Sequence, residues 1–134
     1  MSVIKSKRST SDMEFLYNAR KLQIHTIKKC VNFPKRYTFY VSQPIAECAT
    51  RIHEYVKCAN SIYPLNQHEV QMRRDYFLRA NAELNNLVSQ IEVANELFGI
   101  DMDSLKYWMD IVELEIRLVK AVMKSDRERY KNLP

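Results

Sequence analysis

The sequence predicts an all-α fold, an antiparallel up-down-up-down four-helix bundle with a long third helix, and three observations favour it. Apolar residues recur at steps of three and four in four separate segments, which is the spacing of one face of a helix. The 134 residues include one glycine and four prolines, too few for the many tight turns of an all-β fold. Apolar residues make up 46% and charged residues 28% of the chain, which predicts one folded domain with an ordinary core.

The first helix is expected to begin at Ser11, because Ser11 and Glu14 have the spacing of a capping box. It is expected to end near Asn32, since the residue before Pro34 is driven out of the α region. Residues 1–10 are assigned to a basic N-terminal tail. The predicted buried face of this helix consists of Phe15, Ala19, Leu22, Thr26 and Cys30.

The second helix is expected to run from Pro34 to about Tyr63, where Pro64 marks a turn. Pro44 lies inside this segment, lacks an amide donor and crowds the carbonyl of Tyr40. A kink or a broken first section is therefore predicted there. The predicted buried face consists of Ile45, Ala49, Ile52, Val56, Ala59 and Tyr63.

The third helix is expected over about Gln67 to Phe98, a length of roughly 48 Å at about 1.5 Å per residue. Asn66 and Glu69 form a variant of the capping box at its start. Gly99, the only glycine, follows it where a helix commonly stops. Its buried face has strict heptad spacing and consists of Phe77, Ala80, Leu84, Leu87, Ile91, Ala94 and Phe98.

The fourth helix is expected to start after Asp101, which can cap it. Short connections between the four segments favour the up-down-up-down arrangement. The bundle is assigned to residues 11–125, and residues 126–134 are assigned to a charged C-terminal tail. The predicted buried face of the last helix consists of Leu105, Met109, Val112, Ile116, Val119 and Met123.

The residues required by the common enzyme classes are missing, so no catalytic activity, cofactor or metal is predicted. One glycine cannot build a phosphate-binding loop, which needs at least two. His53 and His68 each precede a glutamate, as in the zinc motif H-E-x-x-H, but Lys57 and Met72 stand where the second histidine belongs. No glutamate is followed by histidine three residues later, as a di-iron bundle would require.

The cysteines and the N-terminal residues are used to predict the cellular compartment of the protein. Cys30, Cys48 and Cys58 lie beside apolar neighbours and form no C-x-x-C motif, so buried, reduced thiols are expected. The first residues lack the apolar core of a secretory signal, and no uncharged stretch approaches the roughly 20 apolar residues of a membrane span. A cytoplasmic location with no membrane contact is expected.

The charge of the chain is unevenly distributed. Its net charge is +5, yet residues 1–36 carry nine basic and two acidic groups, and six basic residues from position 117 onward meet only two acidic ones. An up-down-up-down bundle places both chain ends at one end of the molecule. We expect this basic end to bind nucleic acid or an acidic protein face, the alternative being a solvated surface without a ligand. The candidate nucleic-acid-binding residues are Lys5, Lys7, Arg8, Arg20, Lys21, Arg73, Arg74, Arg79, Arg117, Lys120, Lys124, Arg127, Arg129 and Lys131.

A second candidate surface lies at the opposite end of the expected bundle, where aromatic residues alternate with cations between positions 33 and 40. Such a mixture is typical of platforms that stack single-stranded nucleic acid. Packing against neighbouring helices, or burial in a subunit interface, is the favoured interpretation of these aromatic residues. The secondary candidates are Lys28, Lys29, Lys35, Arg36 and Tyr37.

Three patterns in the chain carry a family resemblance: Phe33-Pro34-Lys35, Arg73-Arg74-x-x-Phe77-x-x-Ala80-x-x-x-Leu84-x-x-Leu87, and Ala94-x-x-Leu97-x-x-Ile100. With them, residues 12–125 resemble a bacterial four-helix-bundle family. Its members include the accessory variability determinant (Avd) proteins of diversity-generating retroelements and the proteins encoded in intervening sequences of ribosomal RNA genes. The arginine pair and the long third helix look more like the Avd branch.

The resemblance implies a homopentameric, barrel-like ring of non-catalytic protomers with a basic surface. In the Avd branch it implies binding of the element's reverse transcriptase and template RNA, with DNA a further ligand to test, in support of mutagenic retrohoming. The alternative is a protein-interaction module of the intervening-sequence type, which binds an acidic partner without nucleic acid.

Overall fold

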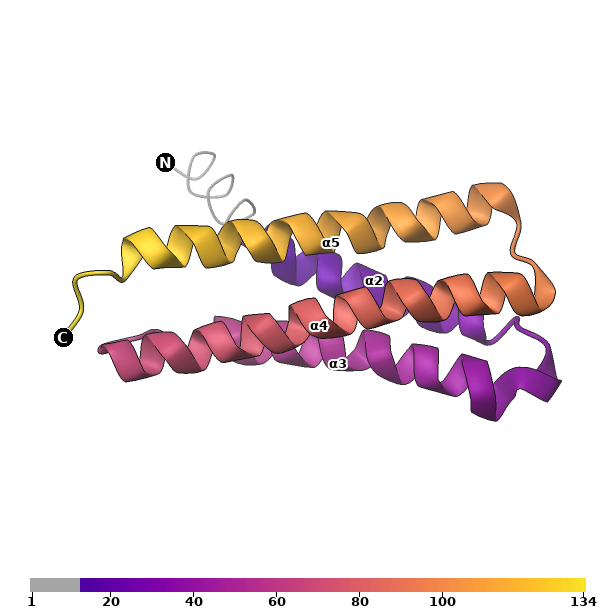
Figure 1. Cartoon of the computed structure of the whole chain (residues 1–134), viewed down its shortest axis with the longest axis horizontal. Coiled ribbons are helices and arrows are strands. Elements are labelled where there is room, and N and C mark those ends of the chain that lie inside the picture. Colours follow the sequence, from indigo (N-terminus) through magenta and orange to yellow (C-terminus); the bar gives the residue numbers. More distant parts are fainter. Residues whose placement is uncertain (1–12) are drawn as a thin grey trace, which may run out of the picture.

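The computed structural model describes residues 13–134, which form helices and no strand. The long helices lie side by side (Figure 1). Two short helical turns, η1 (Lys35–Tyr37, 3-10) and η2 (Thr38–Ser42, π), precede the second of them. The predicted all-α architecture is confirmed. The long helices are α2 (Glu14–Cys30), α3 (Gln43–Asn60), α4 (Gln67–Phe98) and α5 (Met102–Arg129).

The helices pack so that α3 contacts α2 and α4, and α5 contacts the same two helices. Helices α2 and α4 therefore occupy opposite corners of the bundle. The α2–α3 and α4–α5 connections lie at one end, called here the Gly99 end (Figure 1). The α3–α4 connection and the last residues of the chain lie at the other, called here the C-terminal end.

Helix α2 begins at Glu14 with Met13 as its N-cap, and no side chain of the described residues caps it. Ser11, the predicted partner of Glu14 in a capping box, lies outside the described residues. The helix ends at Cys30, two residues before the predicted limit. All five residues of its predicted buried face are buried.

Pro44 divides the segment predicted as the second helix. The chain forms the 3-10 turn η1, then the π-turn η2, and regular α-helix begins only at Gln43. Because Pro44 has no N–H to donate to the carbonyl of Tyr40, it is tolerated only in the first turn of α3. The predicted broken first section is confirmed.

Helix α4 has the predicted limits, because Asn66 caps its start and Gly99 ends it, as the sequence predicts. The side chain of Asn66 accepts a hydrogen bond from the Glu69 amide at 2.9 Å. The Glu69 carboxylate reaches one residue further back than a capping box requires and accepts the amide hydrogen of Leu65 at 2.7 Å. Gly99 ends the helix at a φ of 74°, a conformation that disfavours residues with a Cβ.

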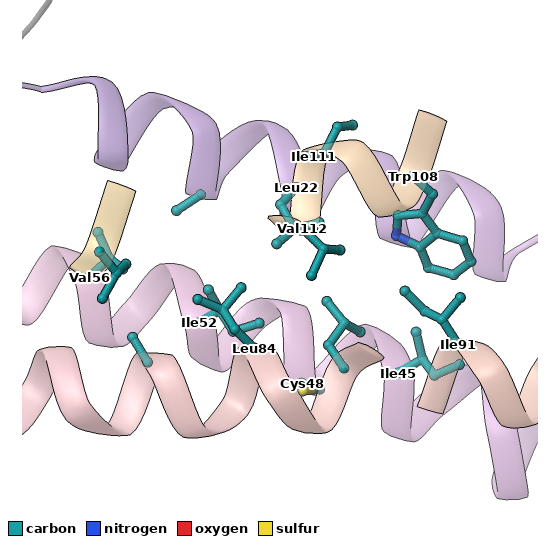
Figure 2. Close-up of a cluster of buried hydrophobic side chains, with 14 of the residues drawn as sticks. Leu22, Ile45, Cys48, Ile52, Val56, Leu84, Ile91, Trp108, Ile111 and Val112 are labelled. Atoms are coloured by element: carbon teal, nitrogen blue, oxygen red, sulfur yellow. The ribbon is translucent and has the colours of Figure 1, made fainter. Parts of the chain in front are cut away.

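The core lies between the four helices, where branched aliphatic side chains pack together with Trp108 (Figure 2). Six of the seven predicted residues on α4 are fully buried, and Phe98 packs against the edge of this core. On the second helix the prediction is wrong for Tyr63, whose side chain is 80% exposed. Helix α3 ends at Asn60, so Tyr63 no longer follows the helical stripe.

Two side chains of α2, Thr26 and Asn18, form hydrogen bonds with α5 inside the core. The indole N–H of Trp108 donates to the Thr26 hydroxyl at 2.9 Å. The Asn18 amide donates to the Ile111 carbonyl and to Oε1 of Glu115, both at 3.1 Å. Oε2 of Glu115 has no hydrogen-bond partner within residues 13–134. Burial raises the pKa of Glu115 to about 8, so the carboxyl is mostly protonated at neutral pH.

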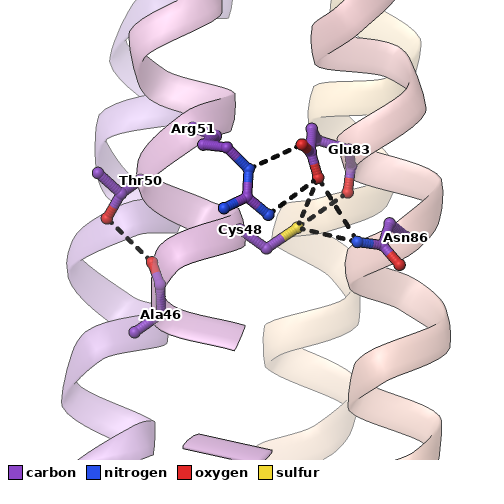
Figure 3. A network of polar contacts seen from close by, with 6 residues as sticks. All are labelled: Ala46, Cys48, Thr50, Arg51, Glu83 and Asn86. Atoms are coloured by element: carbon purple, nitrogen blue, oxygen red, sulfur yellow. Dashed lines mark hydrogen bonds and ion pairs between the residues drawn. The ribbon is translucent and has the colours of Figure 1, made fainter. Parts of the chain in front are cut away.

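A third polar group joins α3 to α4 at a half-buried position (Figure 3). Arg51 donates from Nε to the Glu83 carboxylate at 2.7 Å and from Nη2 at 3.3 Å. The Cys48 thiol donates to the Glu83 carbonyl at 3.2 Å, and the Asn86 amide lies 3.5 Å from the Glu83 carboxylate. The hydrogen bond from Arg51 lowers the pKa of Glu83, which keeps the pair ionised.

Helix α5 continues to Arg129, beyond the boundary predicted at residue 125. The residues after it turn back onto the start of α4. The Gln67 side-chain amide donates to the carbonyls of Tyr130 and Leu133, and the Gln67 backbone N–H donates to the carbonyl of Pro134. These bonds, together with the burial of Asp126, hold the segment assigned to a charged tail against the bundle.

Replacement of Glu115 with glutamine is expected to remove a pH-dependent loss of stability. The pKa of this carboxyl is about 8 in the folded protein and near 4.5 when unperturbed. The folded state thus holds the proton more tightly, and the stability contribution of the protonated group is lost as the pH rises from about 4.5 to 8. The melting temperature of the variant should rise relative to that of the native protein by about 10 °C between pH 5 and pH 8.

Thermal melts of both proteins across this range provide the measurement. Burial and nearby cations lower the pKa of His25 and His53, so these groups also change stability with pH. Both proteins contain them, and their effect cancels in the difference. A difference that stays constant with pH would contradict the assignment.

Candidate nucleic-acid interface

Four exposed cations form a stripe on the outer face of α5, called here the α5 stripe. Arg117, Lys120, Lys124 and Arg127 follow one another at steps of three, four and three residues. This spacing places them on one side of a helix. The other side of α5 is held in the core by residues such as Trp108 and Val119. The stripe therefore faces away from the bundle.

The four cations of the α5 stripe are not engaged in ion pairs within the described part of the chain. None of its four side chains forms an ion pair with any residue between 13 and 134. Nearer the start of α5, the same face carries a paired cation, since Lys106 lies 3.0 Å from Asp110. Unpaired, exposed cations in a row are the electrostatic pattern of a surface that contacts phosphates.

A groove of about 430 Å³ opens between α4 and α5 at the C-terminal end, next to the stripe. Three cations line it, of which Arg127 belongs to the stripe, Arg74 is half-buried and Lys131 pairs with Glu128 at 3.0 Å. Asp126, which is paired with Arg73, also lines the groove, and apolar and neutral polar side chains form the rest of the wall. These include Gln67, Val70, Phe77, Met123 and Tyr130.

Arg73 was predicted to contact nucleic acid, and this prediction is wrong. Its guanidinium is 5% exposed and donates from Nε to the Asp126 carboxylate at 2.6 Å. Nη1 donates to the carbonyls of Ala59 and Ile62 at 3.1 and 3.2 Å. The group also lies over the ring of Phe77. These contacts hold the Arg73 guanidinium between α3, α4 and α5, where a nucleic acid cannot reach it.

Arg79 and Arg129, two further candidates, are exposed but separate from the stripe. The Arg79 guanidinium lies 5.7 Å from the centre of the Tyr76 ring. Arg129 lies 5.9 Å from the Tyr130 ring and lines a second hollow, beside Met13. Both remain available to a ligand that extends beyond the stripe.

Arg20 and Lys21 do not lie with the C-terminal cations, contrary to the prediction. They line a hollow with Lys28 and Tyr107, and the Lys21 ammonium lies 5.6 Å from the centre of the Tyr107 ring. Tyr107 belongs to the first part of α5, nearer the Gly99 end. Lys21 lies half-way along α2. Its side chain is therefore beside the middle of the bundle and not at the C-terminal end, where the other cations gather. Lys5, Lys7 and Arg8 lie outside the described residues.

The secondary candidates for nucleic-acid binding differ in exposure: some are packed against the bundle and others are exposed at its surface. Tyr37 packs on Phe98 at 5.3 Å between ring centres, and Arg36 covers Tyr37 at 5.1 Å, so the packing interpretation is confirmed for this tyrosine. Phe39 and Tyr40, in contrast, are 78% and 84% exposed. Lys28, Lys35 and Arg36 are exposed and Lys29 is half-buried.

The three thiols differ in their surroundings. Cys30 and Cys48 are buried as predicted, and burial raises the pKa of each to about 12. The prediction is wrong for Cys58, which is exposed. It lies beside Ala59 on α3, and because Ala59 faces the core, its neighbour one residue earlier is turned outward. None of the three is in a disulfide.

Sequence reasoning missed two features of this region: the groove beside the stripe and the burial of Arg73. Both depend on the placement of Asp126, which is separated from Arg73 by 53 residues along the chain. The sequence signal for Asp126 was weak, since it is one acid among six C-terminal cations.

Comparison of the chain with protein-family models, curated proteins and solved structures gave no match. Within the part of the chain that the structure describes, no helix has both the length and the apolar character to cross a membrane. The same residues contain no group of three or more His, Cys, Asp or Glu side chains that could hold a metal ion.

Replacement of Arg73 with alanine is expected to lower the free energy of unfolding by about 3–5 kcal/mol, because Asp126 is then left as a buried charge without its partner. Urea denaturation measures this loss. Arg79→Ala is the matched control and should change the free energy of unfolding by no more than about 0.5 kcal/mol, since Arg79 is exposed. Similar losses in the two variants would contradict a special role for Arg73.

Proposed function

We propose that this chain is a non-catalytic accessory protein of a diversity-generating retroelement, and that it binds RNA through the α5 stripe. The observation that carries the RNA-binding part is the row of four exposed, unpaired cations on one face of α5. Flexible cations of this kind bind phosphates without reading the bases. The adjoining groove adds Arg74 to the same surface.

The remainder of the proposal follows the resemblance to the Avd branch. On this proposal the bound RNA is the template of the retroelement, the protein partner is its reverse transcriptase, and the cellular location is the cytoplasm. The protomer is proposed to be an antiparallel up-down-up-down bundle that assembles into a pentameric ring. The positions of the chain connections in Figure 1 support the topology.

The RNA-binding proposal is tested with a matched pair of double variants. Lys120→Glu with Lys124→Glu should lower the affinity for single-stranded RNA at least about tenfold at low salt. The slope of log affinity against log salt should fall by roughly 0.7 to 0.9 for each lost phosphate contact. Fluorescence anisotropy with a labelled RNA over a salt series measures both quantities.

Lys35→Glu with Arg36→Glu changes the charge by the same amount at the Gly99 end and serves as the control. Its affinity should stay within about threefold of the native value, apart from the general effect of net charge. An equal loss in the two double variants would move the site away from α5. Absence of RNA binding at low salt would favour the alternative of an acidic protein partner.

The retroelement part is tested separately. A reverse transcriptase gene and a template repeat beside the gene for this chain are expected. The purified chain should then retain that reverse transcriptase in a pull-down, including after ribonuclease treatment if the contact is direct. A gene neighbourhood without these two elements would contradict this part and leave the RNA-binding test unaffected.

A further inference from the structure

The outer face of α2 is both apolar and basic. Tyr17, Ile24 and Val31 are spaced seven residues apart along it and all are exposed, Val31 by 65%. Lys21 and Lys28 flank this row and line the same hollow as Tyr17 and Ile24. A heptad-spaced apolar row on an exposed face is the pattern by which one helix packs against another. Within the described chain no helix covers it.

The charge of this part of the chain has one sign. Residues 15–46 contain six Lys and Arg residues and no Asp or Glu. Burial and the charges of Lys29 and Lys21 lower the pKa of His25, which lies beside the same hollow. A helix that packs on this face must therefore bring negative charge.

The second half of α4 has the opposite character. Residues 80–105 contain five Asp and Glu residues and no Lys or Arg. Glu83 forms an ion pair with Arg51, while Glu92 and Glu96 are exposed on α4. Val93 and Leu97, next to them, are exposed by 50% and 48%. This face is thus apolar and acidic where the face of α2 is apolar and basic.

The two faces lie at the same height in the bundle and on opposite corners. Phe15 contacts Phe77 at 5.7 Å between ring centres, and Phe33 contacts Phe98 at 4.8 Å. The stretch from Phe15 to Phe33 therefore runs level with the stretch from Phe77 to Phe98, and in the same direction. Because α2 and α4 occupy opposite corners, one molecule cannot join its own two faces.

We propose that the α2 face of one copy of this chain packs in parallel against the α4 face of the next copy, with Lys28 level with Glu92 and the basic groups of one face opposite the acidic groups of the other. Two copies placed side by side with parallel axes bring these faces to the same level without sliding. The contact is heterologous, since each copy contributes a different face, and such contacts close into rings when the rotation between copies permits.

This inference rests on the proposed assembly of copies and names the surfaces that make it. Symmetric pairing of α2 with α2 is disfavoured, because it would oppose like charges. A nucleic acid on the α2 face would leave its apolar row without a matching surface, whereas the α4 face of a second copy supplies both acidic and apolar groups. The α5 stripe lies on a third helix and stays free in such an assembly.

The test is a charge reversal on each face, read as mass by light scattering during gel filtration. The native chain should give a multiple of the 15.9 kDa protomer mass. Lys21→Glu with Lys28→Glu, and separately Glu92→Lys with Glu96→Lys, should each raise the concentration for half-dissociation at least about tenfold, because like charges then meet. All four substitutions in one chain should recover the assembly, because the two faces then again carry opposite charges.

Lys120→Glu with Lys124→Glu is the control, because it reverses two charges on α5 and should leave the assembly intact. A native chain that is a monomer at every concentration would overturn the inference. So would assembly that survives both reversals, or failure of the four-substitution chain to recover it. RNA binding is measured independently by anisotropy, so loss of the α2–α4 contact and loss of the α5 interface are told apart.

Discussion

The buried ion pair between Arg73 and Asp126 determines how α5 sits on the bundle. Asp126 is brought inward to Arg73, and Arg73 is held in turn by two carbonyls at the end of α3. Since successive residues of a helix have fixed angular positions, the inward position of Asp126 sets the outward position of Arg127 and of the residues three and seven before it. A polar interaction inside the molecule thus orients the cations on its surface. The desolvation cost of such a pair is offset because the Arg73 guanidinium has carbonyl acceptors in addition to the carboxylate.

Much of the fold was predictable because local signals agreed with the apolar pattern. For α4, the cap at Asn66, the heptad row and Gly99 all specified the same limits, and the structure has them. The break in the helix at Pro44 was equally predictable, since the loss of one amide donor affects only neighbouring residues of the chain. The site was less predictable. From sequence alone, an arginine is predicted to be an exposed cation unless a partner for it can be identified. The partner of Arg73 is Asp126, which lies on another helix and could not be identified in this way. The course of the chain after residue 125 depended in the same way on distant groups, namely those of Gln67.

The bundle separates charges by helix although its net charge is only +5. Helix α2 is basic, the second half of α4 is acidic, and α5 changes from predominantly acidic to basic along its length. Such separation is costly if the charges of one sign face each other in water, and it becomes favourable when a partner of opposite sign approaches. On the assembly and RNA-binding proposals made above, three distinct outer surfaces would let one small bundle contact neighbouring copies and a polyanion simultaneously. The cations that first looked like one basic end therefore belong to two different surfaces.

Trp108 gives this protein an internal optical reporter. It is the only tryptophan in the chain, it is fully buried, and its indole N–H is bound to Thr26. Its ring lies within 6.3 Å of His25 and 6.1 Å of Phe33, measured between ring centres. An indole in such a dry environment emits at shorter wavelength than one in water, and the emission is set by α2 and α5 remaining together. Intrinsic fluorescence thus reports whether α2 and α5 remain packed around Trp108, which helps to separate a misfolded variant from one that has lost only a surface contact.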